Sequence, residues 1–189
     1  NFSSHTYQTM SSLYEQLRDL FALDETFYFD SSRDVDHLIL RPKNLQDNAL
    51  PSGNALAAHV HWLFSNYDYN ETHINRLDRM FLGVADQANR YPNHFGYWLQ
   101  IADLHSHKTS QIALVSDKKL DSLLPFLNKY HRRYLPNSVI AGWSQSEPGN
   151  TFPALLKDKS PIAGSPAAYI CEDFTCKSPI TDPEEFLEV

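Results

Sequence analysis

The spacing of apolar residues changes once along the chain, near residue 108, and this change limits the fold more than any other feature. Before it, apolar residues recur every three or four positions, which predicts helices over residues 3–23, 52–66, 71–90 and 95–106. After it, short apolar runs typical of strands surround one helical segment. The sequence therefore predicts four helices followed by a small α/β unit, and the helices are expected to pair as antiparallel hairpins.

The part after residue 108 follows a strand, helix, strand order. Apolar runs over 111–117 and 137–143 flank the helical residues 118–135, which is typical of two parallel strands joined by a crossover helix. Pro125 removes a backbone donor, so that helix is expected to kink or to restart early. A third strand is expected in "AAYICEDFTC", with a turn at Glu172 and Asp173, and a capped helix over 181–189.

These elements predict a mainly α fold in two domains. Residues 1–107 are expected to form helical hairpins, and residues 108–189 a small α/β unit of about three strands packed on them. Each helix is expected to bury one apolar face. The residues of these faces are Met10, Leu13, Leu17, Leu20 and Phe21 in the first helix and Leu56, Val60 and Leu63 in the second. They are Ile74, Leu77, Phe81, Val84 and Ala88 in the third helix and Leu99, Ile101, Ala102 and Leu104 in the fourth.

The charge balance and the hydropathy exclude two classes of partner. Sixteen basic residues against 23 acidic ones leave a net charge of −7, whereas a nucleic-acid partner requires a basic face. No apolar run approaches the ~20 residues of a membrane span, and no signal peptide is present. We expect a cytoplasmic location. The chain begins at Asn1 rather than at Met, directly before a helical pattern, so we expect a fragment of a longer protein.

The histidines and cysteines do not have the spacing of a metal or redox site. His59 and His61 would point about 200° apart on a helix, so no metal is expected. Cys171 and Cys176 are four residues apart, whereas thioredoxin-like and zinc-knuckle motifs have two intervening residues. A hairpin disulfide is compatible with the predicted turn, but a cytosolic chain favours two reduced thiols. The common nucleotide-binding and hydrolase motifs are absent, so no cofactor is expected.

The stretch "DNALPSGNALAAH", residues 47–59, has two interpretations. Ser52 or Asn54 can cap the helix that follows, and Gly53 permits an unusual backbone angle. A cap does not require the polar residues Arg41 and Asp47 that precede it. Because a helix start exposes backbone N–H groups, the same residues also fit a binding site for polar ligand atoms.

Three segments together resemble a known family. They are "FYFDSSRDVDHLILRPKNLQDNALPSGNALAAH", "IALVSDKKLDSLLPFLNKYHRRYLPNSVIAG" and "AAYICEDFTCKSPITDPEEF". Their order and spacing resemble the C-terminal part of the spermatogenesis-associated, thioredoxin-domain-containing (YyaL-like) family. The resemblance implies a thioredoxin-like domain upstream, followed by an (α/α)6 toroid of the six-hairpin glycosidase and sugar-epimerase class. Cys171 and Cys176 would then not be the thioredoxin pair.

The resemblance also implies where a site would lie and what it would bind. Loops at one end of the helix pairs line the central funnel of such toroids, and the polar members of the first segment are Tyr28, Asp30, Arg41, Asp47, Ser52 and Asn54. The activity of the family is unassigned, and a carbohydrate-like ligand follows from fold analogy.

In that hypothesis each candidate residue has a chemical role. Arg41 would anchor a hydroxyl-rich or anionic ligand, Asp47 and Asn54 would bind hydroxyls, and Tyr28 or Trp62 would offer a ring face. An epimerase or hydrolase also requires an acid/base pair, which no spacing in this chain singles out. Much of that pair would come from the rest of the toroid, so this fragment alone is expected to be inactive.

The alternative is a non-catalytic scaffold or interaction module that serves the upstream thioredoxin-like redox domain. It predicts that the polar segment is satisfied internally, with Arg41 paired to Asp47 or Asp30 and Asn54 as a cap. In either case, a partial toroid would expose the apolar faces of its edge helices. We therefore expect self-association through those edges, or edges that are already polar.

Overall fold

The chain forms two compact units. A computed structural model describes residues 4–35, 38–144, 152–173 and 175–187. Residues 10–65 and 70–106 make up the first unit, called the helical unit here. The second, called the α/β unit, contains the chain from residue 107 onward together with residues 66–69 and the described part of residues 1–9. Each unit is described by itself.

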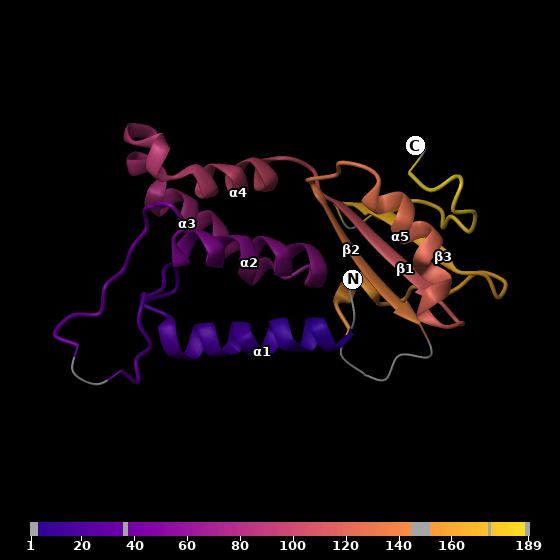
Figure 1. Ribbon diagram of the computed structural model, residues 1–189, viewed down its shortest axis with the longest axis horizontal. Coiled ribbons are helices and arrows are strands. Elements are labelled where there is room, and N and C mark those ends of the chain that lie inside the picture. The colour runs from indigo at the N-terminus through magenta and orange to yellow at the C-terminus, as the bar shows by residue number, and fades with distance from the viewer. Residues whose placement is uncertain (1–3, 36–37, 145–151, 174, 188–189) are drawn as a thin grey trace. The chain divides into compact units, whose positions relative to one another are not determined.

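Among the described residues up to 106, the α-helices are four, as the sequence predicts (Figure 1). They are α1 (Ser4–Phe21), α2 (Gly53–Asp68), α3 (Glu71–Arg90) and α4 (Gly96–Ser106), with a short 3-10 turn, η1 (Pro92–His94), between the last two. The side chain of Asn70 accepts a hydrogen bond from the Thr72 N–H at 2.9 Å, so Asn70 caps the start of α3. Figure 1 shows α1 and α2 running in opposite directions.

The buried faces of two helices differ from the predicted ones. In α3 the buried positions include His73, Arg76 and Met80, whereas the predicted Ile74 and Phe81 are only half-buried. In α2 the side chain of Leu56, which the sequence predicts to be on the buried face, is 46% exposed. The buried face of α2 is instead built from small, aromatic and polar side chains, namely Asn54, Ala55, Ala57, Ala58, His61, Trp62, Phe64, Ser65 and Asn66.

Several apolar side chains remain exposed on the helices. Leu13 on α1, Leu56 on α2, Leu82 on α3 and Leu99 on α4 are each more than one-third exposed. Periodicity alone counts Leu13, Leu56 and Leu99 as core because it does not show what covers each face. No helix in the described part of the chain is long and apolar enough to cross a membrane.

The α/β unit contains the predicted strand, helix, strand arrangement. Its elements are β1 (Ser110–Ser116), η2 (Leu120–Leu123), α5 (Leu124–His131), β2 (Ser138–Ser144), η3 (Ala154–Leu156), β3 (Ala167–Glu172) and β4 (Thr175–Cys176). The described strands form one sheet in the order β2-β1-β3-β4. β1 and β2 are parallel, which confirms the crossover, and β3 runs antiparallel to β1. Pro125 lies in the first turn of α5, so the predicted early restart is also confirmed.

The two faces of this sheet are different. Ile112 and Leu114 of β1 and Ile170 of β3 share a core with Phe126 of α5 and with Phe186. Because side chains alternate along a strand, the neighbouring positions face the other way. That second face carries small residues together with two large rings, Trp143 and Tyr169; the small residues are Ala113, Val115, Val139, Ala141 and Ala167.

Two expectations about the end of the chain are wrong. Cys171 and Cys176 form a disulfide rather than two reduced thiols, and they face each other across the β3–β4 pair. That pair adds a two-residue fourth strand to the three expected. Residues 183–187 form turns instead of the predicted terminal helix. Phe186 is fully buried, with its ring 5.3 Å from the ring of Phe126, so packing selects the tail conformation.

Candidate functional site

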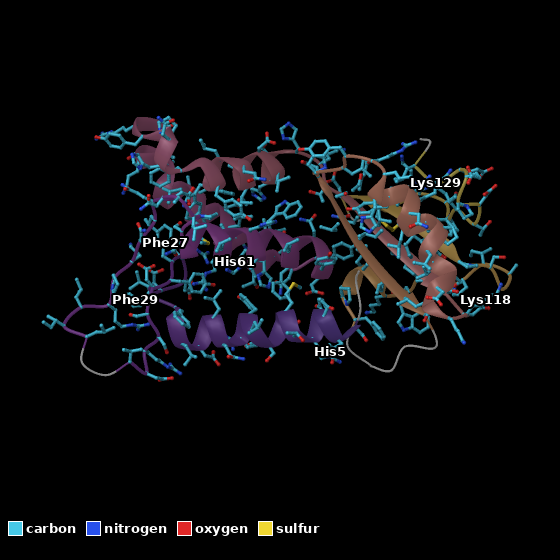
Figure 2. All side chains as sticks on the ribbon, viewed as in Figure 1. His5, Phe27, Phe29, His61, Lys118 and Lys129 are labelled. Atoms are coloured by element: carbon cyan, nitrogen blue, oxygen red, sulfur yellow. A yellow bond between two sulfur atoms is a disulfide. The ribbon has the colours of Figure 1, made fainter. Side chains whose placement is uncertain are left out.

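The long segment between α1 and α2 is held in place by short-range bonds to the end of α1. Tyr28 pairs with Ala22 in an isolated bridge, and the N–H of Phe29 donates to the carbonyl of Phe21 at 2.8 Å. Figure 2 shows Phe27 and Phe29 on this segment. Its described part is therefore an ordered connection that brings polar residues to the first turn of α2.

A cavity of about 450 Å³ lies between this segment, the last turns of α1 and the start of α2. Its walls combine apolar and aromatic groups with amides and one carboxylate, from Leu17, Phe21, Tyr28, Phe29, Asp30, Asn44, Gln46, Asn48, Leu50, Pro51, Ser52 and Gly53. A volume of this size suits a small ligand. Of the six residues that the sequence predicts, Tyr28, Asp30 and Ser52 line the cavity.

Asn54 is a framework residue. Its Oδ1 accepts from the N–H of Tyr28 at 2.9 Å, and its Nδ2 donates to the carbonyl oxygens of Tyr28 and Asn44, both at 3.0 Å. The Asn54 side chain is almost fully buried. All of its polar atoms therefore serve to fix the backbone of residue 28 against the first turn of α2.

Asp47 is buried as well and joins two parts of the helical unit. Its Oδ1 accepts from the Ser52 N–H at 2.9 Å, and its Oδ2 accepts from the Tyr97 N–H at 2.8 Å. Tyr97 lies in the first turn of α4, where a carboxylate interacts favourably with the helix dipole. The backbone of Asp47 also donates to the His94 carbonyl at 2.7 Å.

Arg41 holds the far end of the segment. Its guanidinium donates to the carbonyl oxygens of Leu20, at 3.0 Å, and Ser31, and lies 4.1 Å from the centre of the Phe29 ring. No ion pair joins Arg41 to Asp47 or Asp30 in this part of the structure, so the pairing expected of a scaffold is wrong. Hydrogen bonds to backbone carbonyls stabilise the charge of Arg41 instead.

Ser52 and Asp30 line the cavity and also make hydrogen bonds within the chain. The Ser52 Oγ accepts from the Ala55 N–H at 3.1 Å, which confirms Ser52 as a helix cap, and donates to the Leu45 carbonyl. Asp30 is exposed, and its Oδ2 accepts from the Asn44 N–H at 3.0 Å. Trp62 is buried and does not line the cavity.

Behind the cavity lies a buried chain of polar rings that the sequence pattern does not predict. The hydroxyl of Tyr28 lies 2.8 Å from Nε2 of His61, and Nδ1 of His61 lies 2.8 Å from Nδ1 of His73 (Figure 2 labels His61). Burial, together with the nearby charges of His73 and Arg76, lowers the pKa of His61 to about 3. Burial also raises the pKa of Tyr28. Tyr28 and His61 are therefore neutral near pH 7.

Two further groups enclose this chain. The guanidinium of Arg76 lies 4.4 Å from the centre of the Tyr28 ring and donates to the carbonyl oxygens of Asp24 and Thr26. Tyr14 packs its ring 5.5 Å from that of His61. His61 and His73 are twelve residues apart on two helices, so local spacing does not pair them. A useful signal is that His73, Leu77, Met80 and Val84 continue one helical stripe.

No group of three or more His, Cys, Asp or Glu side chains lies together as a metal site among the residues that the structure describes. The His61–His73 pair has two nitrogens at hydrogen-bond distance, which requires a proton between them. The cavity can therefore hold a polar ligand beside a fixed hydrogen-bonded network.

Comparison with known proteins finds distant relatives of this chain. It is similar to spermatogenesis-associated protein 20. The human protein of that name is 24% identical over 162 residues, the rat protein 26% over 166 residues and the mouse protein 24% over 162 residues. Each match covers 84% of this chain and 20% of the relative, so the chain spans about a fifth of their length. No family model matches.

Proposed function

We propose that the helical unit binds a small hydroxyl-rich ligand of the carbohydrate class in the cavity beside the start of α2. The observation that carries this proposal is the free amides in its walls. The side chains of Gln46 and Asn48 have no hydrogen-bond partner in the described structure, and both residues are exposed. Primary amides donate and accept at once, which matches sugar hydroxyls.

The aromatic walls support the same class of ligand. Phe21, Tyr28 and Phe29 line the cavity beside the amides, and the carboxylate of Asp30 lies in the same wall. Sugars present apolar C–H faces as well as hydroxyls, so a site with ring faces and a few polar groups suits them. The framework residues Asn54, Asp47 and Arg41 keep these walls in place and would contribute indirectly.

The similarity to much longer proteins supports a divided role. We propose that this chain is the C-terminal part of a thioredoxin-domain-containing protein with an (α/α) toroid, and that any acid/base pair comes from outside it. The chain alone would then bind without turning over its ligand. The activity of the whole protein, epimerase-like or glycosidase-like, remains part of this proposal.

The direct test is isothermal titration calorimetry of the chain with glucose, N-acetylglucosamine and glucose 6-phosphate. We expect saturable binding of at least one, weakened about tenfold in Gln46→Ala/Asn48→Ala by the loss of two hydrogen bonds. The matched control is Gln87→Ala, an exposed position on α3. If none of the three compounds binds, or if the control weakens binding equally, the proposal is wrong.

A scaffold serving the upstream thioredoxin-like domain is the second candidate, because Arg41, Asp47, Ser52 and Asn54 all have internal partners. The exposed side chains Leu38, Ile39 and Leu40 would provide a contact surface. Self-association through the exposed helix leucines belongs to the same proposal. Charged substitutions at Ile39 that disrupt assembly of the full-length protein, without changing sugar binding by this chain, would favour it.

We also propose a cytoplasmic location. The disulfide is an observation against it. Disulfides such as Cys171–Cys176 are rare in cytosolic proteins of ordinary organisms. Maleimide labelling in freshly lysed cells decides the matter. Labelled thiols would support the cytoplasm, and complete protection until a reductant is added would contradict it.

A further inference from the structure

A second cavity, within the α/β unit, has a different chemistry. It has a volume of about 550 Å³ and lies beside the end of β2 and the 3-10 turn η3. Trp143 and Phe152 supply aromatic rings, Pro153, Ala154 and Leu156 supply apolar surface, and three ionisable side chains complete the lining. This volume falls in the range of small-molecule sites.

The sheet explains why a hollow forms at this place. Trp143 projects from the same face as Ala113, Ala141 and Ala167, according to the strand register. Tyr169, opposite Ala113, is the second large ring on this face, and the small side chains leave space between the two rings. Phe152 meets Trp143 edge to face, with ring centres 5.9 Å apart, and so encloses one side of the space.

The three ionisable side chains of the lining differ in their availability. Both carboxylate oxygens of Asp68 are occupied, since Oδ1 accepts from the Ala154 N–H and Oδ2 accepts from the Tyr7 hydroxyl at 2.6 Å. Lys157 is exposed and has no partner among the described residues. Because Lys157 both lines the cavity and is exposed to solvent, we place it at the cavity mouth.

The second lysine is more fixed in position. Lys159 is half-buried, and its Nζ lies 5.6 Å from the centre of the Tyr169 ring. The hydroxyl of Tyr169 donates to the Ser160 carbonyl at 2.8 Å, which holds that ring beside the lysine stem. Two lysines against one carboxylate give the lining a net positive charge, and the oxygens of that carboxylate already accept internal hydrogen bonds.

We propose that this cavity binds a small aromatic anion, a flat ring that carries a carboxylate or a phosphate. The ring would lie against Trp143 and Phe152, and the anionic group would accept hydrogen bonds from Lys157 and Lys159. Rings stack well on aromatic side chains, and a charge-assisted hydrogen bond is about twice as strong as a neutral one. This site is independent of the sugar site proposed for the helical unit.

The test uses three probes with the same ring. They are 2-naphthoate and 2-naphthyl phosphate, which are anions, and 2-naphthamide, which is neutral. Binding is followed by proton–nitrogen NMR through the indole N–H signal of Trp143, assigned as the signal that Trp143→Phe lacks. The other two tryptophans, Trp62 and Trp98, are buried in the helical unit and serve as internal references.

We expect both anions to shift the Trp143 signal saturably, and the neutral amide to bind roughly tenfold more weakly or not at all, as the loss of one charge-assisted bond implies. Lys157→Gln/Lys159→Gln should remove the preference for the anions, whereas the control Lys177→Gln, at an exposed lysine outside the lining, should keep it. The stronger of the two anions identifies the ligand as a carboxylate or a phosphate.

Two results would overturn the proposal. One is the absence of any Trp143 shift at millimolar concentrations of both anions. The other is equal affinity for the anions and the amide, unchanged in the lysine variant, which would mean apolar contact without anion recognition. Because both lysines lie outside the core, loss of folding is not expected to obscure either result.

Discussion

The two cavities differ in what their polar groups do. Beside the helical unit's cavity, the buried side chains of Asp47 and Asn54 bond to the backbone, and the exposed side chains of the wall, such as Gln46 and Asn48, remain available. In the α/β unit the walls are mostly apolar, and the lysines are the groups without competing hydrogen bonds. The comparison teaches that a residue's polarity does not identify a ligand contact. The decisive property is whether its hydrogen-bonding capacity is already used.

Among the variants that test this distinction, Asn54→Ala has the largest expected effect on stability. The substitution leaves the buried N–H and carbonyl of Tyr28 without partners, which should lower the free energy of unfolding by about 3 kcal/mol. Chemical denaturation measures the change. Asn48→Ala, at an exposed amide in the same cavity, is the matched control and should change it by less than about 0.5 kcal/mol. Equal effects at the two positions would abolish the distinction.

The second test removes the disulfide of the α/β unit. Cys171→Ser/Cys176→Ser releases a short closed loop, for which chain entropy predicts a loss of about 2 kcal/mol. Hydrogen exchange should report the change in β3 and β4 and leave the amide protection of α2 and α3 as it was. Increased exchange in those helices would show that the two units do not unfold separately.

The third test uses pH. His61 has a folded pKa of about 3, below its usual value of about 6.5, so the unfolded state binds more protons between these values. The stabilisation is complete above pH 6.5 and is lost progressively as the pH falls, by about 2 kcal/mol between pH 6.5 and pH 5. The groups facing His61 are Tyr14, Tyr28, His73 and Arg76.

Two measurements check this pH dependence. Proton NMR of the imidazole rings should show His61 neutral at pH 5, and His61→Gln should have a shallower decline in stability than the unchanged chain. His5→Gln, on the exposed surface of α1, is the control. A His61 ring that becomes protonated near pH 6.5 in the folded chain would be incompatible with the buried network.

The smallest expected effect concerns the lysines of the second cavity. Lys157 is exposed and has no partner in the described structure, so Lys157→Gln should leave the free energy of unfolding within about 0.5 kcal/mol. Thermal and chemical unfolding both measure it. A loss above 1 kcal/mol would mean that Lys157 stabilises the fold and is not held available for a ligand.

Local sequence signals predict where elements begin and end better than which face they bury. α3 spans Glu71–Arg90, as predicted, because Asn70 caps its start and Pro92 follows its end. The buried face of α2 is predicted only in part, since Leu56 is exposed while Asn54 and His61 are buried. Periodicity finds an apolar stripe but contains no information on the neighbouring helices.

The candidate site is predicted as a segment rather than as a set of contacts. The sequence identifies the polar stretch around Asp47 and Asn54, and the structure places a cavity beside it. The sequence does not distinguish these framework residues from Gln46 and Asn48, whose amides are exposed. It also misses the His61–His73 pair, because that contact depends on how α2 and α3 pack.

The most direct measurement is proton–nitrogen NMR of the side-chain amides during titration with N-acetylglucosamine or glucose 6-phosphate. Free and engaged amides coexist in one cavity region, so a single spectrum compares them. We predict that the Gln46 and Asn48 amide signals shift saturably while the Asn54 amide signal stays in place, held by its bonds to Tyr28 and Asn44. A shift confined to Asn54, or no saturable shift at Gln46 and Asn48, would contradict the account.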